Sequence, residues 1–372
     1  MKRTFFLLFI FLNIQLGFSQ EKAINAIDTS NMSSEIAKVI AENSELFPNN
    51  VQLSIALIDG EKTNYIGVIR KNDTLQTIDN KGAIFEIGSN TKVFTSLLLS
   101  HQIHAGNLQL NDKLIDVLPF KIETSPEHTD KITLQTLANH SSGLPRLPQN
   151  IFPLLQTNME NPYKKYTIDM LHTYLKNGIS LQNEPTKVSA YSNLGAGLLG
   201  YILTEKTKKS YESLLQEQIL KPLQMNHTTT DLSKVDQNKL VIGIKADGTE
   251  ASNWDFTDAL VGAGGMKSNV VDMEKFIRKN FEDENTVYNL PQQETIKVNE
   301  MVRVGLGWHI ITKEGKTVLF HNGGTGGYLS CMIIDKKNKK AALLLSNLSA
   351  FSPQGPKIDN LCFSLIELLS KN

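Results

Sequence analysis

The stretch from Phe85 to Leu99 constrains the fold of this chain more than any other part of its sequence. A short apolar run leads to Gly88, and no further Gly or Pro follows until Gly106. The residues from Val93 to Leu99 are apolar on nearly every side of a helix. Because a helix that is apolar all round is usually buried inside a domain, the sequence predicts a buried helix that begins at Ser89.

Ser89 and Lys92 lie three residues apart at the start of this helix and therefore face the same way. Desolvation disfavours a charged ammonium, so Lys92 can become a base beside a serine nucleophile. This is the S-x-x-K arrangement of acyl-transferring serine enzymes. The alternative is that Ser89 is only a helix N-cap, a position that serine favours.

The composition is that of an ordinary globular protein. The chain has 372 residues, of which 40% are hydrophobic and 20% charged, and its formal net charge is zero. This length allows two domains or one large domain with insertions. The charge balance indicates no nucleic-acid partner and no attraction to an acidic membrane surface.

The N-terminus has the pattern of a secretory signal peptide. Lys2 and Arg3 precede an unbroken apolar run from Phe5 to Leu12, and small residues at the −3 and −1 positions fit a cut after Ser19. We therefore expect a signal peptide over residues 1–19, a mature domain over residues 20–372, and a periplasmic or secreted protein without a transmembrane span. An uncleaved anchor is the alternative.

Hydrophobic periodicity divides the mature chain into three regions. A sheet region over residues 33–109 is followed by a mainly helical insert over 110–250 and a second sheet region over 260–372. Helices are predicted over residues 33–46, 132–140, 168–176, 194–206, 211–219 and 358–369, and one that starts near Ser268; strands are predicted over 51–57, 64–70, 317–321, 328–334 and 341–346.

A second polar group precedes the helix that is predicted to start at Leu194. In an extended approach, Tyr191 and Asn193 point the same way. A phenol can relay a proton, and an amide can orient a substrate or a lysine. The alternative is an aromatic core residue followed by Asn193 as the helix N-cap.

A third group, His321-Asn322-Gly323-Gly324, follows a predicted strand and continues into further glycines. The absence of side chains lets this backbone approach a ligand closely. No G-x-x-x-x-G-K-[ST] pattern is present and a strand follows, so nucleotide binding is not indicated. The pattern favours a strand that binds substrate through its N–H groups.

Together, Ser89-x-x-Lys92, Tyr191-x-Asn193 and His321-x-Gly323 resemble the three motifs of the penicillin-recognising serine hydrolases. The similarity is strongest to class C β-lactamases, their DD-peptidase relatives and related esterases. Three further segments match that family and extend the resemblance over nearly the whole mature chain: residues 132–145, 262–266 and 305–308.

The resemblance implies an α+β fold in which helices flank an antiparallel sheet with an inserted helical region. It implies that Ser89 is the nucleophile, that Lys92 and Tyr191 share general-base and general-acid duties, and that Asn193 orients them. The oxyanion hole would be the N–H groups of Ser89 and Gly324. No metal and no organic cofactor are implied.

One residue departs from the family pattern. β-Lactamases of this type usually carry Lys-Thr-Gly at the third motif, where this chain has His321-Asn322-Gly323. Histidine is only partly charged near neutrality, so an imidazole here would bind a substrate carboxylate through a charge that fades as the pH rises. Some DD-carboxypeptidases and D-amino-acid peptidases of the family resemble this chain in having His.

We therefore expect an exported serine hydrolase that acts through an acyl-enzyme. A D-alanyl-D-alanine carboxypeptidase or endopeptidase is the favoured interpretation, with a small peptide, β-lactam or ester as substrate and peptidoglycan as a further partner. A carboxylesterase and a penicillin-binding sensor with little turnover are the alternatives. Cys331 and Cys362 either pair or remain two separate buried thiols.

Overall fold

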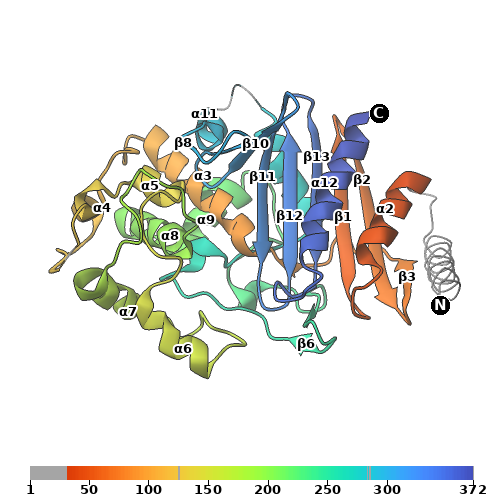
Figure 1. Ribbon diagram of the computed structural model, residues 1–372, viewed down its shortest axis with the longest axis horizontal. Coiled ribbons are helices and arrows are strands. Elements are labelled where there is room, and N and C mark those ends of the chain that lie inside the picture. The colour runs from red at the N-terminus through yellow and green to blue at the C-terminus, as the bar shows by residue number, and fades with distance from the viewer. Residues whose placement is uncertain (1–31, 125, 283, 285, 372) are drawn as a thin grey trace, which may run out of the picture.

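Within residues 32–371, with 125, 283 and 285 excepted, a computed structural model shows a nine-stranded sheet in which all neighbouring strands are antiparallel (Figure 1). The strands lie in the order β3 (Thr74–Thr77), β2 (Lys62–Lys71), β1 (Gln52–Asp59), β13 (Lys340–Ser346), β12 (Leu329–Asp335), β11 (Lys316–Gly324), β10 (His309–Lys313), β9 (Val302–Val304) and β8 (Ile296–Lys297).

Helices cover both faces of this sheet (Figure 1). On one face, α2 (Ser34–Ser44) and α12 (Pro356–Lys371) pack over Leu57 and Leu344. On the other face, α3 (Thr91–His104) and α10 (Val270–Asn280) share a larger core with Ile58 and Leu343. Adjacent strand residues point to opposite faces, which explains why the central strands are continuous apolar runs.

The segment between the two sheet regions is mainly helical, as predicted. It contains α4 (Leu114–Val117), α5 (Leu134–Ala138), α6 (Phe152–Thr157), α7 (Ile168–Thr173), α8 (Asn193–Thr207) and α9 (Tyr211–Leu215), and near its end the short strands β5 (Gly243–Ile244) and β6 (Glu250–Ala251). The helix α8 contacts α3 and α5, so the helical segment encloses the buried helix that follows Ser89.

The structure adds strands to the predicted sheet and lengthens one of the predicted strands. Strands β3, β8, β9 and β10 were not predicted, because three of them have four residues or fewer and all four are partly polar. The strand β11 also continues through Gly323 and Gly324, which pair with Ser330 and Leu329 of β12. The glycine-rich stretch is therefore part of the sheet at its start.

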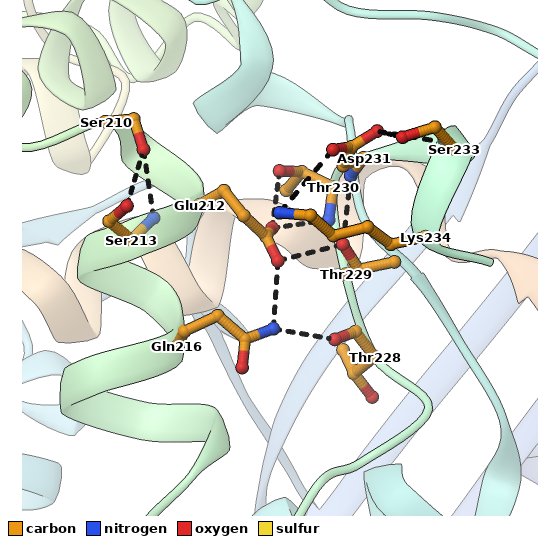
Figure 2. A network of polar contacts seen from close by, with 10 residues as sticks. All are labelled: Ser210, Glu212, Ser213, Gln216, Thr228, Thr229, Thr230, Asp231, Ser233 and Lys234. Carbon is orange, nitrogen blue, oxygen red and sulfur yellow. Dashed lines mark hydrogen bonds and ion pairs between the residues drawn. The ribbon is translucent and has the colours of Figure 1, made fainter.

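A carboxylate at the start of α9 anchors the segment around residue 229 (Figure 2). Glu212 accepts hydrogen bonds from the Thr229 hydroxyl at 2.8 Å, from the Thr230 N–H and hydroxyl at 2.8 and 2.7 Å, and from the Gln216 amide at 2.9 Å. The Thr229 carbonyl in turn accepts from the Lys267 N–H at 2.8 Å. The network thus connects the helical segment to the short strand that contains Lys267.

That strand, β7 (Lys267–Ser268), pairs with β4 (Phe85–Glu86), which leads directly to Ser89. The turn that carries the serine is therefore supported by hydrogen-bonded backbone from a segment about 180 residues further along the chain. No local sequence pattern around Ser89 indicates this support.

Two other predictions have a structural outcome. Cys331 and Cys362 are free, fully buried thiols in hydrogen-bond contact with each other, and burial raises the pKa of Cys331 well above its usual value. The predicted signal peptide, residues 1–19, lies outside the described residues. In the part of the chain that is described, the helices are too short or too polar to cross a membrane.

Candidate active site

The turn that carries Ser89 is a short 3₁₀ helix, Gly88–Asn90, and α3 begins only at Thr91. Gly88 has φ +49°, and a Cβ atom at this position would lie 2.6 Å from the Gly324 nitrogen. Only glycine fits this conformation and this close approach. The Thr91 hydroxyl donates to the Gly88 carbonyl at 2.7 Å, so Ser89 is held at the buried start of α3.

The side chains of Ser89 and Lys92 meet as the S-x-x-K spacing predicted. Lys92 Nζ lies 2.9 Å from Ser89 Oγ and 2.6 Å from the carbonyl oxygen of Ala263, which belongs to the glycine-rich bend. Lys92 is 1% exposed. Burial, and after it the charge of Arg146, hold the pKa of Lys92 well below its usual value. A neutral amine beside a hydroxyl is a competent general base.

Tyr191 completes this group from the segment before α8. Its ring lies 4.8 Å from Lys92 Nζ, and its phenol forms a side-chain hydrogen bond with Ser89. Burial raises the pKa of the phenol, and the hydrogen bond with Ser89 and the charge of Arg146 act in the opposite direction. The phenol is thus kept protonated and can give a proton to a leaving group.

His140 positions the segment that carries Tyr191, a role that the sequence did not reveal. The two rings pack with centroids 4.5 Å apart, and His140 Nδ1 accepts a hydrogen bond from the Ser192 N–H at 3.2 Å. His140 is buried, and desolvation together with the charge of Lys92 holds its pKa well below the usual value. Its imidazole is therefore neutral, with the proton on Nε2.

Asn193 is not the N-cap of α8. That position belongs to Ser192, whose hydroxyl accepts from the Gly195 N–H at 2.9 Å, so the capping alternative for Asn193 is wrong. The Asn193 amide nitrogen lies 3.4 Å from the Tyr163 hydroxyl. Its oxygen is buried and, among the described residues, has no hydrogen-bond partner. The acceptor capacity of this amide oxygen is therefore unused.

The third motif brings a strand edge against the serine turn. A Cβ atom on Gly323 would lie 2.0 Å from the Ile87 carbonyl oxygen and 2.7 Å from the Ser89 nitrogen. The backbones can approach this closely only because Gly323 has no side chain. The backbone nitrogens of Ser89 and Gly324 therefore lie at the same junction between the serine turn and β11.

The structure corrects the expected charge of His321. The ring is 1% exposed, and its pKa is well below the usual value because of burial, the neighbouring His309 and the charge of Lys92. Nδ1 lies 2.6 Å from the Asn322 carbonyl, to which it must donate. Nε2 is then an acceptor, and it is buried and without a partner among the described side chains. The expectation of a partly charged imidazole near neutrality is wrong.

This geometry changes the expected pH dependence. An unperturbed histidine titrates between roughly pH 6 and 8. Because His321 stays neutral over this range, its titration should not change KM for a carboxylate-bearing peptide. We expect the KM profiles of the wild type and of His321→Gln to have the same shape. A rise of KM over this range that disappears in His321→Gln would contradict the prediction.

A cleft of about 500 Å³ opens over Ser89. Asn193 and Gly324 line it beside the serine, and Arg146 lies at the same surface. Most of the remaining wall is apolar: Leu147, Phe152, Leu155, Met159, Pro162, Tyr163, Trp254, Phe256, Ala263, Ala350 and Phe351. A larger cavity of about 1160 Å³ around Asn50, Lys239 and Asn347 contains no residue of the three motifs.

Sequence reasoning missed Arg146 and the apolar wall. Arg146 directly follows the segment Ile132–Pro145, whose sequence resembles that of the family. The carbonyl of Arg146 accepts from the Leu194 N–H at 3.1 Å, which ties the end of that segment to the start of α8. A charged residue directly after a segment that resembles the family is the sequence feature that could have indicated this position.

Sequence comparison identifies the family of this chain. A sequence model of the Beta-lactamase family matches residues 51–360, which is most of the chain. The chain belongs to the Beta-lactamase family. The members of this family are serine hydrolases, and the resemblance inferred from the three motifs is confirmed at this level.

Individual relatives of this Beta-lactamase family chain are distant. It is 27% identical to Protein flp of Staphylococcus aureus over 280 residues, which cover 72% of this chain and 53% of that protein. The chain thus spans about half the length of Protein flp. It is 26% identical to the D-alanyl-D-alanine-carboxypeptidase/endopeptidase AmpH of Escherichia coli over 98% of this chain and 97% of AmpH.

Among solved structures, the beta-lactamase/D-alanine carboxypeptidase of Pseudomonas syringae superposes with a TM-score of 0.74. The superposition covers 90% of this chain and 98% of that one, at 17% sequence identity. At this identity the likeness concerns the fold alone. The predicted fold class, helices that flank an antiparallel sheet, is confirmed.

Proposed function

We propose that this protein is an exported serine hydrolase that forms an acyl-enzyme on Ser89 and acts on D-alanyl-D-alanine peptides as a carboxypeptidase or endopeptidase. The observation that carries the proposal is the 2.9 Å contact between Ser89 Oγ and a buried Lys92 whose pKa is lowered. The export part rests on the basic start and the apolar run Phe5–Leu12, and it implies a periplasmic or secreted protein.

In the proposed acylation step, Lys92 takes the proton of Ser89 while Oγ attacks the carbonyl carbon of the substrate. The negative charge that develops on the carbonyl oxygen is stabilised by the N–H groups of Ser89 and Gly324. When the carbon–nitrogen bond breaks, Tyr191 supplies a proton to the leaving amine and is reprotonated from Lys92. A water molecule, deprotonated by the same groups, then releases the acyl group and restores Ser89.

The remaining motif residues bind and orient the substrate in this proposal. Asn193 offers its free amide oxygen, and Gly323 keeps the strand edge close enough for Gly324 to reach the oxyanion. His321 contributes as a neutral hydrogen-bond acceptor behind the site, with its ring centroid 6.4 Å from that of Tyr191. Together with Ser89, Lys92 and Tyr191, these residues form the complete proposed site.

A carboxylesterase is the second candidate, and the wall of the cleft favours it. Phe152, Met159 and Phe351 are 50%, 78% and 71% exposed at the mouth of the cleft. Large apolar side chains exposed together often mark a binding surface. An apolar acyl group of an ester would cover them, whereas a short polar peptide would leave much of this surface in water.

One experiment separates these functions. The purified protein is incubated with a peptide that ends in D-Ala-D-Ala, with nitrocefin and with a short p-nitrophenyl ester, and product release is followed for each. Release of D-alanine supports the peptidase, and ester turnover without it supports the esterase. A stable acyl group on Ser89 with little turnover, seen by mass spectrometry, would instead indicate a penicillin-binding sensor.

A further inference from the structure

Arg146 is a cation at the active-site cleft that the proposed reaction does not use. Its side chain lines the cleft together with Ser89 and Asn193, and the residue is exposed. No carboxylate of the described residues forms an ion pair with it, whereas Arg70, Arg278 and Arg303 each pair with an acid. Arginine binds carboxylates through two parallel hydrogen bonds, so an unpaired guanidinium beside a nucleophile is suited to an anionic substrate.

The backbone around Arg146 is fixed to the second motif. The Arg146 carbonyl accepts from the Leu194 N–H at 3.1 Å, and the Pro145 carbonyl accepts from the Ser192 hydroxyl at 2.7 Å. The guanidinium carbon lies 5.0 Å from the centre of the Tyr191 ring, which is within the range of a cation–π contact. Arg146 therefore has a defined position relative to the reacting groups.

The charge of Arg146 acts on the reacting groups themselves. At Lys92 it adds to burial, the larger cause, in lowering the pKa, whereas at Tyr191 it opposes burial, which raises the pKa of the phenol. These interactions agree with the short distance to the Tyr191 ring. They also mean that a test of Arg146 must separate substrate binding from an effect on Lys92 or Tyr191.

We propose that Arg146 binds a carboxylate of the substrate and thereby makes the enzyme selective for substrates that carry an anionic group near the scissile bond. The proposal rests on the proposed acyl-enzyme function. His321 cannot take this role, because its Nδ1 proton is used by Asn322 and its Nε2 is an acceptor. Among the described residues that line this cleft, Arg146 is the one lysine or arginine.

The apolar side chains of the cleft indicate a second property of the substrate. Leu147 follows Arg146 along the chain, and Phe152, Met159 and Phe351 lie around the same cleft. A ligand that fills this cleft would place its anion at Arg146 and an apolar group against these side chains. The preferred substrate is therefore amphipathic, with one carboxylate and one apolar substituent.

The test uses matched pairs of chromogenic substrates. In one pair the carboxylate is on the acyl side, with mono-p-nitrophenyl glutarate compared with p-nitrophenyl pentanoate. In the other pair it is on the leaving group, with a benzoyl thioester of mercaptoacetic acid compared with the thioester of mercaptoacetamide. The readout is the ratio of kcat/KM between the anionic and the neutral member, measured for the wild type, Arg146→Met, Arg146→Lys and the control Lys164→Met.

We expect the wild type to prefer the anionic member of at least one pair, through a lower KM. Arg146→Met should reduce that ratio by roughly 10- to 100-fold, the effect of losing a hydrogen bond to a charged group. Arg146→Lys should keep part of the preference. Lys164→Met removes a surface charge that lies outside the cleft lining, and it should leave the ratio as in the wild type.

Two results would overturn the inference. An unchanged ratio of kcat/KM between the anionic and neutral substrates in Arg146→Met would show that the residue does not bind the anion. An equal loss of kcat for anionic and neutral substrates, with a shifted pH profile, would show that Arg146 acts only through Lys92 and Tyr191. If the wild type hydrolyses none of the four substrates and is not labelled by a fluorophosphonate, the proposed function itself fails.

Discussion

Replacing Ser89 by alanine is expected to abolish covalent labelling of the protein by a fluorescent penicillin and by a fluorophosphonate. Alanine removes the Oγ atom that would form the acyl bond, while the Gly88 turn and the contacts of Asn90 and Thr91 remain. The measurement is in-gel fluorescence of the purified variant, with thermal unfolding to show that the fold is retained. Labelling of Ser89→Ala at the wild-type rate would contradict the assignment.

Ser96→Ala is the matched control, because Ser96 is a buried serine further along α3 that does not line the cleft. It should label like the wild type.

The pH dependence of wild-type labelling adds a second criterion. A protonated Lys92 cannot accept the Ser89 proton, so the rate should fall as the pH decreases through the lowered pKa of Lys92. Labelling that rises as the pH falls would exclude Lys92 as the base.

The second large effect concerns stability. Glu86 and Lys267 face each other in the register of β4 and β7 directly before the serine turn, and they are 2% and 1% exposed. Glu86 accepts hydrogen bonds from the Trp254 N–H at 2.7 Å and from the Asn253 amide at 3.0 Å. Lys267→Met should lower the free energy of unfolding by about 3 kcal/mol, because it leaves a buried carboxylate without its cation. Urea unfolding measures this loss.

The loss of unfolding free energy should depend on pH with opposite signs in the single variants Lys267→Met and Glu86→Gln. Burial raises the pKa of Glu86, so in Lys267→Met its ionisation opposes folding at high pH, and the loss should shrink as the pH falls toward 4.5. Burial lowers the pKa of Lys267, so in Glu86→Gln the loss should shrink as the pH rises toward 10.5. Equal pH profiles for both variants would contradict the coupling of the two charges.

The double variant Glu86→Gln/Lys267→Met provides the control for this pair. With both charges removed, it should recover much of the stability that either single change costs, since neither buried charge is then left without the opposite charge that it interacts with. Because β4 leads into Ser89, the single variants should also label more slowly than the double variant. Additive losses in the double variant would show that the two residues act independently.

The catalytic core of the candidate site could be predicted from the sequence because it depends on local spacing. Ser89 and Lys92 meet because residues that are three apart lie on the same face of a helix. The apolar residues from Val93 to Leu99 require that helix to be buried. The same local rules located α8 after Tyr191 and the strand β11, which contains His321. The order of these elements was enough to indicate the family.

The charge state of His321 could not be predicted in this way. It depends first on burial, then on His309, Lys92 and His140, which come from three other segments of the chain, and a hydrogen bond to the Asn322 carbonyl fixes the proton on Nδ1. A sequence pattern places a histidine on a strand but does not state how deeply the strand is covered. The expectation of a fading charge therefore failed for a tertiary reason.

The sequence by itself determined the buried helix, the three motifs and the alternation of sheet and helical regions, because each follows from periodicity within one segment. Only the tertiary structure decided which groups surround the serine. Arg146, the supporting pair Glu86 and Lys267, and the neutral His321 owe their roles to contacts between segments far apart in the chain. Burial and charge pairing are properties of such contacts, and no single segment contains them.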